Sequence, residues 1–423
     1  MSDLPEMSPS GRIPLLVDCD TGIDDSLALL YAAASPECEL VAVTCTAGNV
    51  DAAQVAENTR AVLALAGRSD VEVAVGRPTP LARELVTTPE THGPRGIGYA
   101  ELPPARTPLS ARYSPDLIVE EARRRPGELT LVTLAPLTNV ALAVLREPEL
   151  PRLLRRLVIM GGSYRSSGNT APTTEWNVNV DPESAKIVFE AFGPRAVESA
   201  ARIDRLAHGG PGVSAGSGGS DGSDGSAARL DRLAHGGPGG SAGSAEPAGS
   251  GGFGEPAGSA GPGGSAGSAA SAGGRAYSRP IALGLDVTER AKMLPEHLAA
   301  LAARAGCAPD GTRPDGSVNE VVRYLADALR FYMEFHSRYD GFYGAFIHDP
   351  LALATALDPS LVRTEAVTVD VELGGRLTTG ETVTDWRRVW NRRPNVDVAV
   401  EADAARFMDR FIQRVGDLAA RLG

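Results

Sequence analysis

The sequence contains few of the residues that build zinc clusters, disulfide frameworks or membrane spans. Only four of its 423 residues are cysteine, and no two of them form a CxxC pair. This spacing argues against a zinc cluster, and the low cysteine density argues against a small disulfide scaffold. No stretch of 18 consecutive apolar residues occurs, and residues 1–12 lack the cationic and apolar regions of a secretion signal. We therefore expect a protein of the reducing cytoplasm that has no membrane partner.

Basic residues are also scarce relative to acidic ones. The chain has 41 Lys and Arg against 53 Asp and Glu, which gives a net charge of −12, and only Lys186 and Lys292 are lysines. Proteins that bind the phosphate backbone of nucleic acids usually carry a basic stripe. We therefore expect no nucleic-acid partner.

One long segment has almost no branched apolar or aromatic residues. Half of the 48 glycines lie between residues 209 and 274, and the segment 202–212 recurs as 229–239 with a single change. Such a segment buries too little apolar surface to offset the entropy that ordering its backbone would cost. We expect a flexible N-terminus over 1–12, a single domain formed by 13–192 and 279–423, and a disordered low-complexity insertion over 193–278.

Outside this insertion, short apolar runs alternate with stretches of helical periodicity. This alternation predicts an α/β fold with a single open, mostly parallel sheet flanked by helices. Strands are predicted at 13–17, 40–45, 129–134, 156–160 and 281–285, and helices at 26–34, 51–66, 137–145, 182–191, 318–333 and 407–422.

The densest group of chemically active residues follows the first predicted strand. Asp18, Asp20, Asp24 and Asp25 fall within eight residues, and no Lys or Arg occurs between Arg12 and Arg60. The helix dipole contributes only about 0.3–1 kcal/mol per charge, which is too little to hold four carboxylates together in a crevice. A bound hard cation such as Ca²⁺ or Mg²⁺ would resolve the repulsion, because such ions prefer oxygen ligands. The alternative is a set of solvated acids that cap a helix.

Polar residues also follow other predicted strands. Asn49 comes after the second strand, residues 134–139 and 160–163 follow two later ones, and a polar loop continues to Asn177. In an open α/β sheet, ligands bind beyond the carboxyl ends of the strands. Further along, His348-Asp-Pro350 has the local pattern of a helix N-cap with Pro at N1, and its histidine could donate a proton near neutral pH.

The chain carries the motifs Asp18-Cys-Asp-Thr-Gly-Ile-Asp-Asp25, Leu134-Ala-Pro-Leu-Thr-Asn139, Ile159-Met-Gly-Gly162, Glu175-Trp-Asn-Val-Asn-Val-Asp-Pro182, Leu285-Asp-Val-Thr288 and His348-Asp-Pro350. These motifs resemble those of the nucleoside hydrolases of the inosine-uridine-preferring family. They occur in family order over residues 13–192 and 279–415, and the family lacks an insertion of this length.

The resemblance implies hydrolysis of the N-glycosidic bond of ribonucleosides, as in purine and pyrimidine salvage, with a nucleoside as the small-molecule substrate. It implies a Ca²⁺, with Mg²⁺ as the other possibility, held by Asp20, Asp25, the carbonyl of Leu134 and Asp349. Asp20 would also take the proton from the attacking water, and Asp18 would orient the ligands. We further expect a homo-oligomer, a dimer or a tetramer.

The resemblance also assigns residues to the substrate. Asp24, Asn169, Glu175 and Asn177 match positions that bind ribose hydroxyls, and Asn49 matches a position near the attacking water. His348 matches the acid that protonates the leaving base. The positions that match contacts to the nucleobase are His92, Tyr332 and His336. The presence of both His92 and His348 favours the branch of the family that accepts inosine and uridine over the branch that is specific for purine nucleosides.

Two other functions remain open. The Asp18-Cys-Asp20-Thr21 segment resembles the DxDx[TV] strand end of haloacid-dehalogenase-type phosphatases. That fold requires a later lysine at the phosphate site, and neither of the two lysines follows an apolar strand. The other possibility is a non-catalytic module that binds nucleosides or Ca²⁺.

Overall fold

The computed structural model describes residues 11–193 and 278–423. These residues belong to one compact unit. Nearly all of the predicted N-terminal segment 1–12 and of the predicted insertion 193–278 lie outside the described residues. Within those residues, no helix is long and apolar enough to cross a membrane.

Within the described residues, nine strands form one sheet in the order β10-β9-β11-β6-β5-β4-β1-β2-β3. All neighbours from β11 to β3 pair in parallel, and only β9 pairs antiparallel, with β11 and β10. The predicted mostly parallel sheet is therefore confirmed. The strands are β1 (Ile13–Cys19), β2 (Cys38–Cys45), β3 (Glu72–Val75), β4 (Thr130–Thr133), β5 (Arg156–Met160), β6 (Ile281–Leu283), β9 (Val362–Val371), β10 (Thr382–Asp385) and β11 (Val396–Ala402), and a separate pair is formed by β7 (Lys292–Met293) and β8 (Ala345–Phe346).

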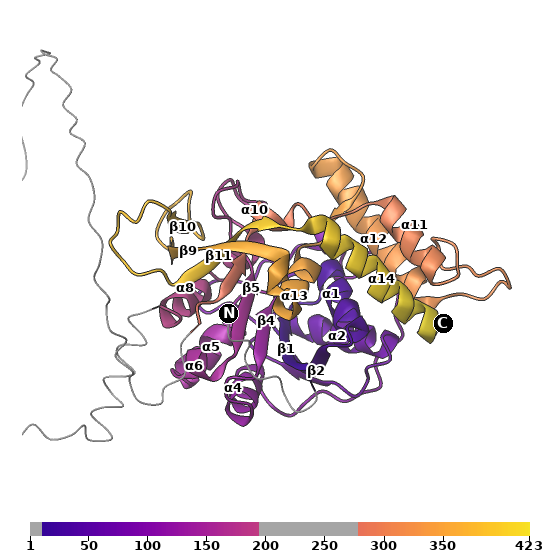
Figure 1. Ribbon diagram of the computed structural model, residues 1–423, viewed down its shortest axis with the longest axis horizontal. Helices are drawn as coiled ribbons and strands as arrows, with labels where there is room; N and C mark the ends of the chain where they lie inside the picture. The colour runs from indigo at the N-terminus through magenta and orange to yellow at the C-terminus, as the bar shows by residue number, and fades with distance from the viewer. Residues whose placement is uncertain (1–10, 194–277) are drawn as a thin grey trace, which may run out of the picture. The chain divides into compact units, whose positions relative to one another are not determined.

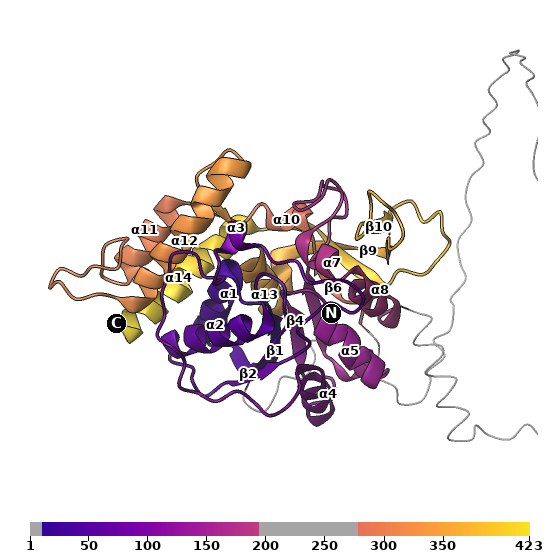
Figure 2. The ribbon, with the colours of Figure 1, turned by 180° about the vertical axis from the view of Figure 1, so that it is seen from behind.

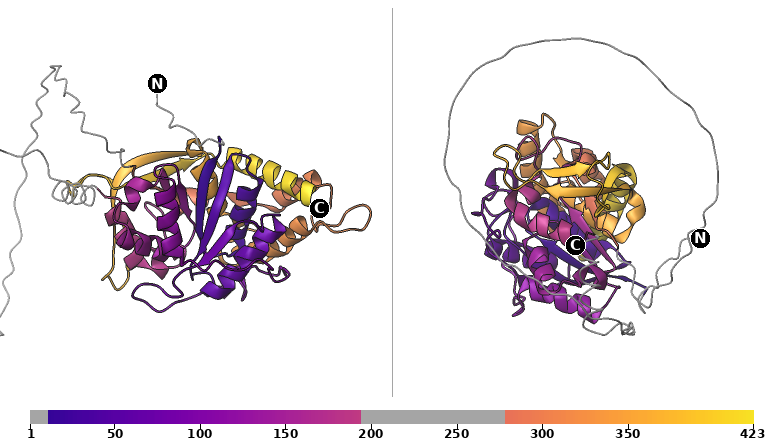
Figure 3. Two further views of the ribbon diagram at one scale, coloured as in Figure 1. Left: turned by 90° about the horizontal axis from the view of Figure 1, so that it is seen from below. Right: turned by 90° about the vertical axis from the view of Figure 1, so that its left-hand side faces the viewer.

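Helices cover both faces of this sheet, as the views in Figures 1 and 3 show. Alternate residues of β1 point to opposite faces, so that Leu15 and Val17 join one apolar core and Leu16 joins the other. Beside the first core lie α1 (Ile23–Ala34), α2 (Ala52–Leu65), α11 (Pro295–Arg304), α12 (Glu320–Tyr339), α13 (His348–Leu357) and α14 (Ala404–Leu422), and beside the second lie α4 (Ser114–Arg124), α5 (Thr138–Arg146), α6 (Leu150–Leu153) and α8 (Pro182–Ala191).

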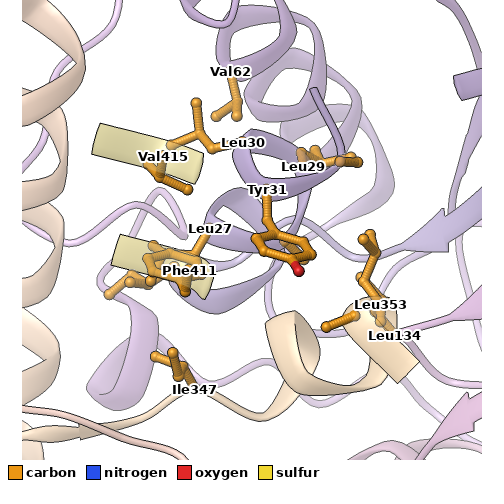
Figure 4. Packing of buried hydrophobic residues seen from close by; sticks show 14 of the residues in the cluster. Leu27, Leu29, Leu30, Tyr31, Val62, Leu134, Ile347, Leu353, Phe411 and Val415 are labelled. Carbon is orange, nitrogen blue, oxygen red and sulfur yellow. The ribbon is translucent and has the colours of Figure 1, made fainter. Parts of the chain in front are cut away.

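The core of the first face packs α1 against the C-terminal helix α14. Tyr31 of α1 stacks on Phe411 of α14 with ring centroids 6.0 Å apart, and Figure 4 shows these rings among the leucines of α1. Such aromatic pairs add about 0.5–1.5 kcal/mol to the burial of their surfaces. The packing fixes α1, and therefore the acidic turn that begins it.

The sheet changes direction between β1 and β4. From β1 the chain proceeds outward to β2 and β3, and it then returns to place β4, β5 and β6 on the other side. Ligands bind at such a switch point, beyond the carboxyl ends of the two strands. Short helices and turns gather near this edge, as seen from behind in Figure 2: α3 (Pro89–His92), α7 (Trp176–Val180) and α10 (Leu285–Thr288).

Two local predictions were wrong. The predicted strand 281–285 ends at Leu283, because Gly284 caps α10 and turns the chain into a helix. Asp349 is not an N-cap, because α13 begins one residue earlier, at His348, and its N-cap Ile347 has no side-chain cap. The carboxyl group of Asp349 is therefore not used by its own helix.

Candidate active site

The turn between β1 and α1 is held by one of its own carboxylates. Asp25 lies at the third position of α1, and its Oδ2 accepts a hydrogen bond from the backbone N–H of Gly22 at 2.8 Å. Its Oδ1 accepts another from the N–H of Asp20 at 3.2 Å. Helix N-termini favour such acceptors, because their first N–H groups have no partner within the helix.

Carboxyl groups from two distant segments meet at this turn. Oxygen atoms of Asp24, Asp25 and Asp349 lie within 4.8 Å of one another, and all three residues are buried. Asp349 comes from α13, which packs against α1. Asp20 is also buried beside this group; its Oδ2 accepts from the backbone N–H of Asn49 at 2.8 Å, and its Oδ1 has no hydrogen-bond partner among the described residues.

The buried carboxyl groups oppose one another's ionisation. Burial, followed by the charge of Asp25, raises the pKa of Asp24 from 3.8 to about 8. The same two causes raise the pKa of Asp20 well above its usual value, and burial followed by the neighbouring aspartates does so for Asp349. A site of buried oxygen ligands that cannot all be ionised at neutral pH fits a hard divalent cation, which would offset their repulsion.

Asn49 links the two strands that end at this turn. Besides the bond from its N–H to Asp20, its side-chain Nδ2 donates to Asp25 Oδ2 at 3.2 Å. The preceding residue is Gly48, where a Cβ atom would lie 2.0 Å from Asp20 Oδ2. Only glycine therefore allows the second strand to approach Asp20 this closely.

Asp18 is buried but does not bond to the carboxyl cluster. Its Oδ1 accepts from Thr44 Oγ1 at 2.6 Å and from Asn139 Nδ2 at 2.8 Å. Asn139 Nδ2 also lies 3.1 Å from the carbonyl oxygen of Cys45. Burial raises the pKa of Asp18 to about 7. Its side chain thus ties the ends of β1 and β2 to α5.

Two of the residues predicted to bind ribose, Glu175 and Asn177, lie near the ends of β4 and β5, where they bond to the backbone. Glu175 is the N-cap of α7, and its carboxylate accepts from the N–H groups of Asn177, Val178 and Gly162 at 2.8–3.1 Å. Asn177 Nδ2 donates to the carbonyl of Leu134 at 2.8 Å. This bond brings the carbonyl predicted to hold the metal into contact with the predicted ribose site.

Asn169 belongs to the same loop but lies on its outer side. Its Oδ1 accepts from the N–H of Trp176 at 3.0 Å, in an exposed position. The bond holds the loop against α7. In this conformation the side chain therefore supports the loop that carries Glu175.

Three histidines and a tyrosine line up beside the acidic cluster. The ring of Tyr332 lies between those of His92 and His336, with centroid distances of 5.3 and 4.7 Å. His92 Nδ1 accepts from the N–H of Ile23 at 3.1 Å, which places the proton of the neutral ring on Nε2. Burial lowers the pKa of His92 to about 3. His336 Nδ1 lies 2.7 Å from the carboxylate of Asp340.

His348 is neutral at pH 7 in this structure. Burial, followed by the neighbouring His336 and His92, lowers its pKa to about 3. The sequence-based expectation of a group that titrates near neutral pH is therefore not met in the ligand-free protein. The ring is held by Thr288, whose Oγ1 lies 2.8 Å from Nδ1.

Sequence reasoning missed several residues that position this site. Thr288 lies in a quoted motif, but the 60 residues that separate it from His348 gave no signal of contact. Asp340 could have been found as the residue that follows the helix of His336, four positions after that histidine. Nothing local indicated the bonds that Thr44 and Asn139 make to Asp18.

The sequence of this chain is similar to those of known proteins. A sequence model of the family described as inosine-uridine preferring nucleoside hydrolase matches residues 15–204 and 268–409. The pyrimidine-specific ribonucleoside hydrolase RihA of Enterobacter sp. is 30% identical over 410 residues, which cover 97% of this chain and 99% of that protein. The inosine-uridine preferring nucleoside hydrolase of Leishmania major is 30% identical over 409 residues, which cover 95% and 98%.

Solved structures share the fold. The purine-preferring ribonucleoside hydrolase from Gardnerella vaginalis superimposes with a TM-score of 0.70 at 24% identity, over 96% of this chain and 99% of that one. A plant nucleoside hydrolase gives a TM-score of 0.68 at 24% identity, over 95% and 98%. Because the family model matches most of the chain and the two relatives are 30% identical over nearly their full length, we conclude that this chain belongs to the inosine-uridine preferring nucleoside hydrolase family.

Proposed function

We propose that this ribonucleoside hydrolase cleaves the N-glycosidic bond with a water molecule activated at the buried carboxyl cluster, and that the cluster holds Ca²⁺. The observation that carries the proposal is the convergence of Asp20, Asp24, Asp25 and Asp349 at the β1–β4 switch point. The repulsion among these buried groups supports a divalent cation, with Mg²⁺ as the alternative. Asp20, Asp25, Asp349 and the carbonyl of Leu134 would hold it.

The environment of Asp20 suits a general base. The backbone N–H of Asn49 orients its Oδ2, whereas Oδ1 makes no hydrogen bond to any residue that the structure describes. This oxygen is free to accept a proton from the attacking water. When bound, Ca²⁺ would lower the pKa of that water, so that a carboxylate suffices as the base.

Asp24 and Glu175 supply negative charge near the predicted ribose. The reaction passes through a state in which the sugar ring carries positive charge, and nearby carboxylates stabilise it. Asn177 supports the same side of the site through its bond to the Leu134 carbonyl. Asn169 and Asn49 hold the two loops that border it.

The neutral histidines suit the leaving base. A negative charge that develops on the departing base favours the protonated form of His348, because it opposes the causes that keep the pKa of this ring low. His92 presents an N–H at Nε2, which can donate to a carbonyl or ring nitrogen of the base. Tyr332 and His336 complete this side, and we propose that it accepts both uridine and inosine.

A ribose-release assay with uridine and inosine tests the proposal. Turnover should need Ca²⁺ and should stop in EDTA. It should be retained in the control Asp310→Asn, which alters an exposed loop carboxylate. Absence of ribose release at micromolar enzyme, with nucleoside binding still detectable, would identify a non-catalytic module instead. Release of phosphate from a simple phosphoester, lost in Asp18→Asn, would favour the phosphatase alternative.

The role of His348 can be tested separately. We expect His348→Ala to lower kcat for uridine by about 10²–10⁴-fold, the range typical of acid–base catalysis. It should change turnover of p-nitrophenyl riboside little, because that leaving group departs without a proton. Equal losses on the two substrates would exclude the acid role.

A further inference from the structure

The short helix α10 contacts both sides of the candidate active site. We propose that two residues of its sequence Leu285-Asp-Val-Thr288 are positioning residues: Asp286 for the loop beside the ribose, and Thr288 for the imidazole of His348. The proposal rests on the proposed function, because it assigns these residues to the two halves of that site. Neither Asp286 nor Thr288 touches the predicted reacting atoms.

Asp286 holds the loop that leaves the end of β5. Its carboxylate accepts from three successive backbone N–H groups, those of Tyr164 at 2.9 Å, Arg165 at 2.7 Å and Ser166 at 3.0 Å. Hydrogen bonds to a charged acceptor are stronger than those between neutral groups. One side chain therefore fixes the first turn of the loop that continues through Asn169 to Glu175.

Close packing between the ends of β5 and β6 supports this arrangement. The N–H of Leu285 donates to the carbonyl of Gly162 at 3.0 Å, and the N–H of Gly162 in turn donates to Glu175 Oε2 at 2.9 Å. At Gly284, a Cβ atom would lie 2.6 Å from Tyr164 Cδ2 and 2.8 Å from the Gly162 carbonyl oxygen. Only glycine leaves room for this contact. The backbone of α10 is therefore linked to Glu175 through one residue, Gly162.

Thr288 holds the other side of the site. Its Oγ1 lies 2.8 Å from His348 Nδ1 and 3.2 Å from the carbonyl oxygen of Gly284. The hydroxyl has one proton. When it donates that proton to the Gly284 carbonyl, it can accept from His348 Nδ1–H, which leaves Nε2 as the nitrogen that faces the leaving base.

This contact fixes the orientation of a buried ring. A side chain without a hydroxyl at position 288 would leave Nδ1 of His348 unpartnered in a buried place. Thr288 therefore keeps the imidazole in one orientation relative to the leaving base.

The two roles give different kinetic signatures. We expect Thr288→Val to lower kcat for uridine on the order of tenfold or more, the size of effect typical of partners that orient a reacting ligand. Turnover of p-nitrophenyl riboside should stay near the wild-type value, and Thr288→Ser should restore uridine turnover. Asp286→Asn should instead raise KM for uridine and for p-nitrophenyl riboside alike, because both carry the ribose.

The chain offers matched controls for both substitutions. Thr355 of α13 is a buried threonine that also bonds back to the carbonyl four residues earlier, that of Leu351 at 2.9 Å, and Thr355→Val tests the loss of such a hydroxyl. Asp310 accepts the N–H of Thr312 at 2.9 Å in an exposed loop, and Asp310→Asn tests the loss of a loop carboxylate. Both controls should keep wild-type kinetics on both substrates.

Several results would overturn the proposal. These are equal losses on the two substrates in Thr288→Val, failure of Thr288→Ser to restore turnover, the same loss in Thr355→Val, or an unchanged KM in Asp286→Asn. A nitrogen-15 NMR spectrum of the histidine side chains gives a readout that needs no turnover. The His348 signals, assigned by their loss in His348→Gln, should show a protonated Nδ1 in the wild type and should shift in Thr288→Val.

The NMR measurement also separates this proposal from the proposed function. If the protein does not hydrolyse nucleosides but the His348 signals respond to Thr288→Val, the proposed function fails and the contact stands. If Thr288→Val does not fold, the wild-type spectrum decides, because an unprotonated Nδ1 in His348 contradicts the assigned bond.

Discussion

Neutralising Asp24 should stabilise the metal-free protein at neutral pH. This residue is buried in the first turn of α1, beside Asp25 and Asp349. Its pKa is raised from 3.8 to about 8, first by burial and then by the charge of Asp25. Asp24→Asn keeps the size of the side chain and removes its charge.

The expected size of the effect follows from the difference in pKa between the folded and unfolded states. Because the folded-state pKa is raised, the carboxyl group favours folding most below about pH 4, and this contribution falls until about pH 8. Between about pH 4 and pH 7 the unfolded chain ionises while the folded protein keeps the proton, which costs about 1.4 kcal/mol per pH unit. At pH 7 this difference lowers the free energy of unfolding of the wild type by up to about 4 kcal/mol, and Asp24→Asn avoids that loss.

Urea unfolding of both proteins in EDTA, at pH 4.5, 6 and 8, measures this difference. The stability advantage of Asp24→Asn should be small at pH 4.5 and should grow toward pH 8, and Asp310→Asn should show no such gain. Added Ca²⁺ should reduce the advantage, because a cation offsets the same repulsion. A variant that is no more stable than the wild type at pH 8, or whose advantage does not depend on pH, would refute the electrostatic account of the cluster.

Three further outcomes are expected. Asp20→Asn should lower kcat for uridine by about 10²–10⁴-fold with folding retained, as measured by ribose release and circular dichroism, because the proposed base is lost. In calorimetry, Asp349→Asn should weaken Ca²⁺ binding more than Asp24→Asn, whereas the reverse order would replace Asp349 by Asp24 in the proposed ligand set. Joining residue 192 to residue 279 by a short linker should leave kcat for uridine within a few fold of the wild-type value, because these residues connect α8 to the start of β6, at the edge of the sheet opposite the site; a large loss would show that the removed segment contributes to turnover.

The strands β1, β2, β4, β5 and β6 and six of the helices could be predicted, because a sheet covered on both faces leaves a strong local pattern, whereas β3 and β11 were not predicted. The continuous apolar run of β1 is buried on both sides, and the polar residues that follow it mark its end. The carboxyl cluster could be predicted for a similar reason, since three of its four members lie within six residues of one another. Asp349 came from the resemblance, and its local pattern indicated a helix cap instead.

What the sequence left open depends on contacts between distant segments. The antiparallel strands β9 and β10 mix buried and partly exposed residues, and their sequences gave no clear alternation of apolar and polar residues. The protonation of His348 follows from its burial among residues of several elements, and the contact with Thr288 joins positions 60 residues apart. Neither burial nor such a contact leaves a mark on neighbouring residues of the sequence.

Burial acts on the two halves of the site in opposite directions. It raises the pKa of the aspartates and lowers that of His92 and His348, because in each case it disfavours the charged form. Burial therefore opposes the charged form in both halves. We expect each half to become charged through what it binds, the aspartates through a cation and His348 through the negative charge on the leaving base. A nucleoside bound across the two halves would place its glycosidic bond between these two charges. The charges would therefore form where they stabilise the transition state.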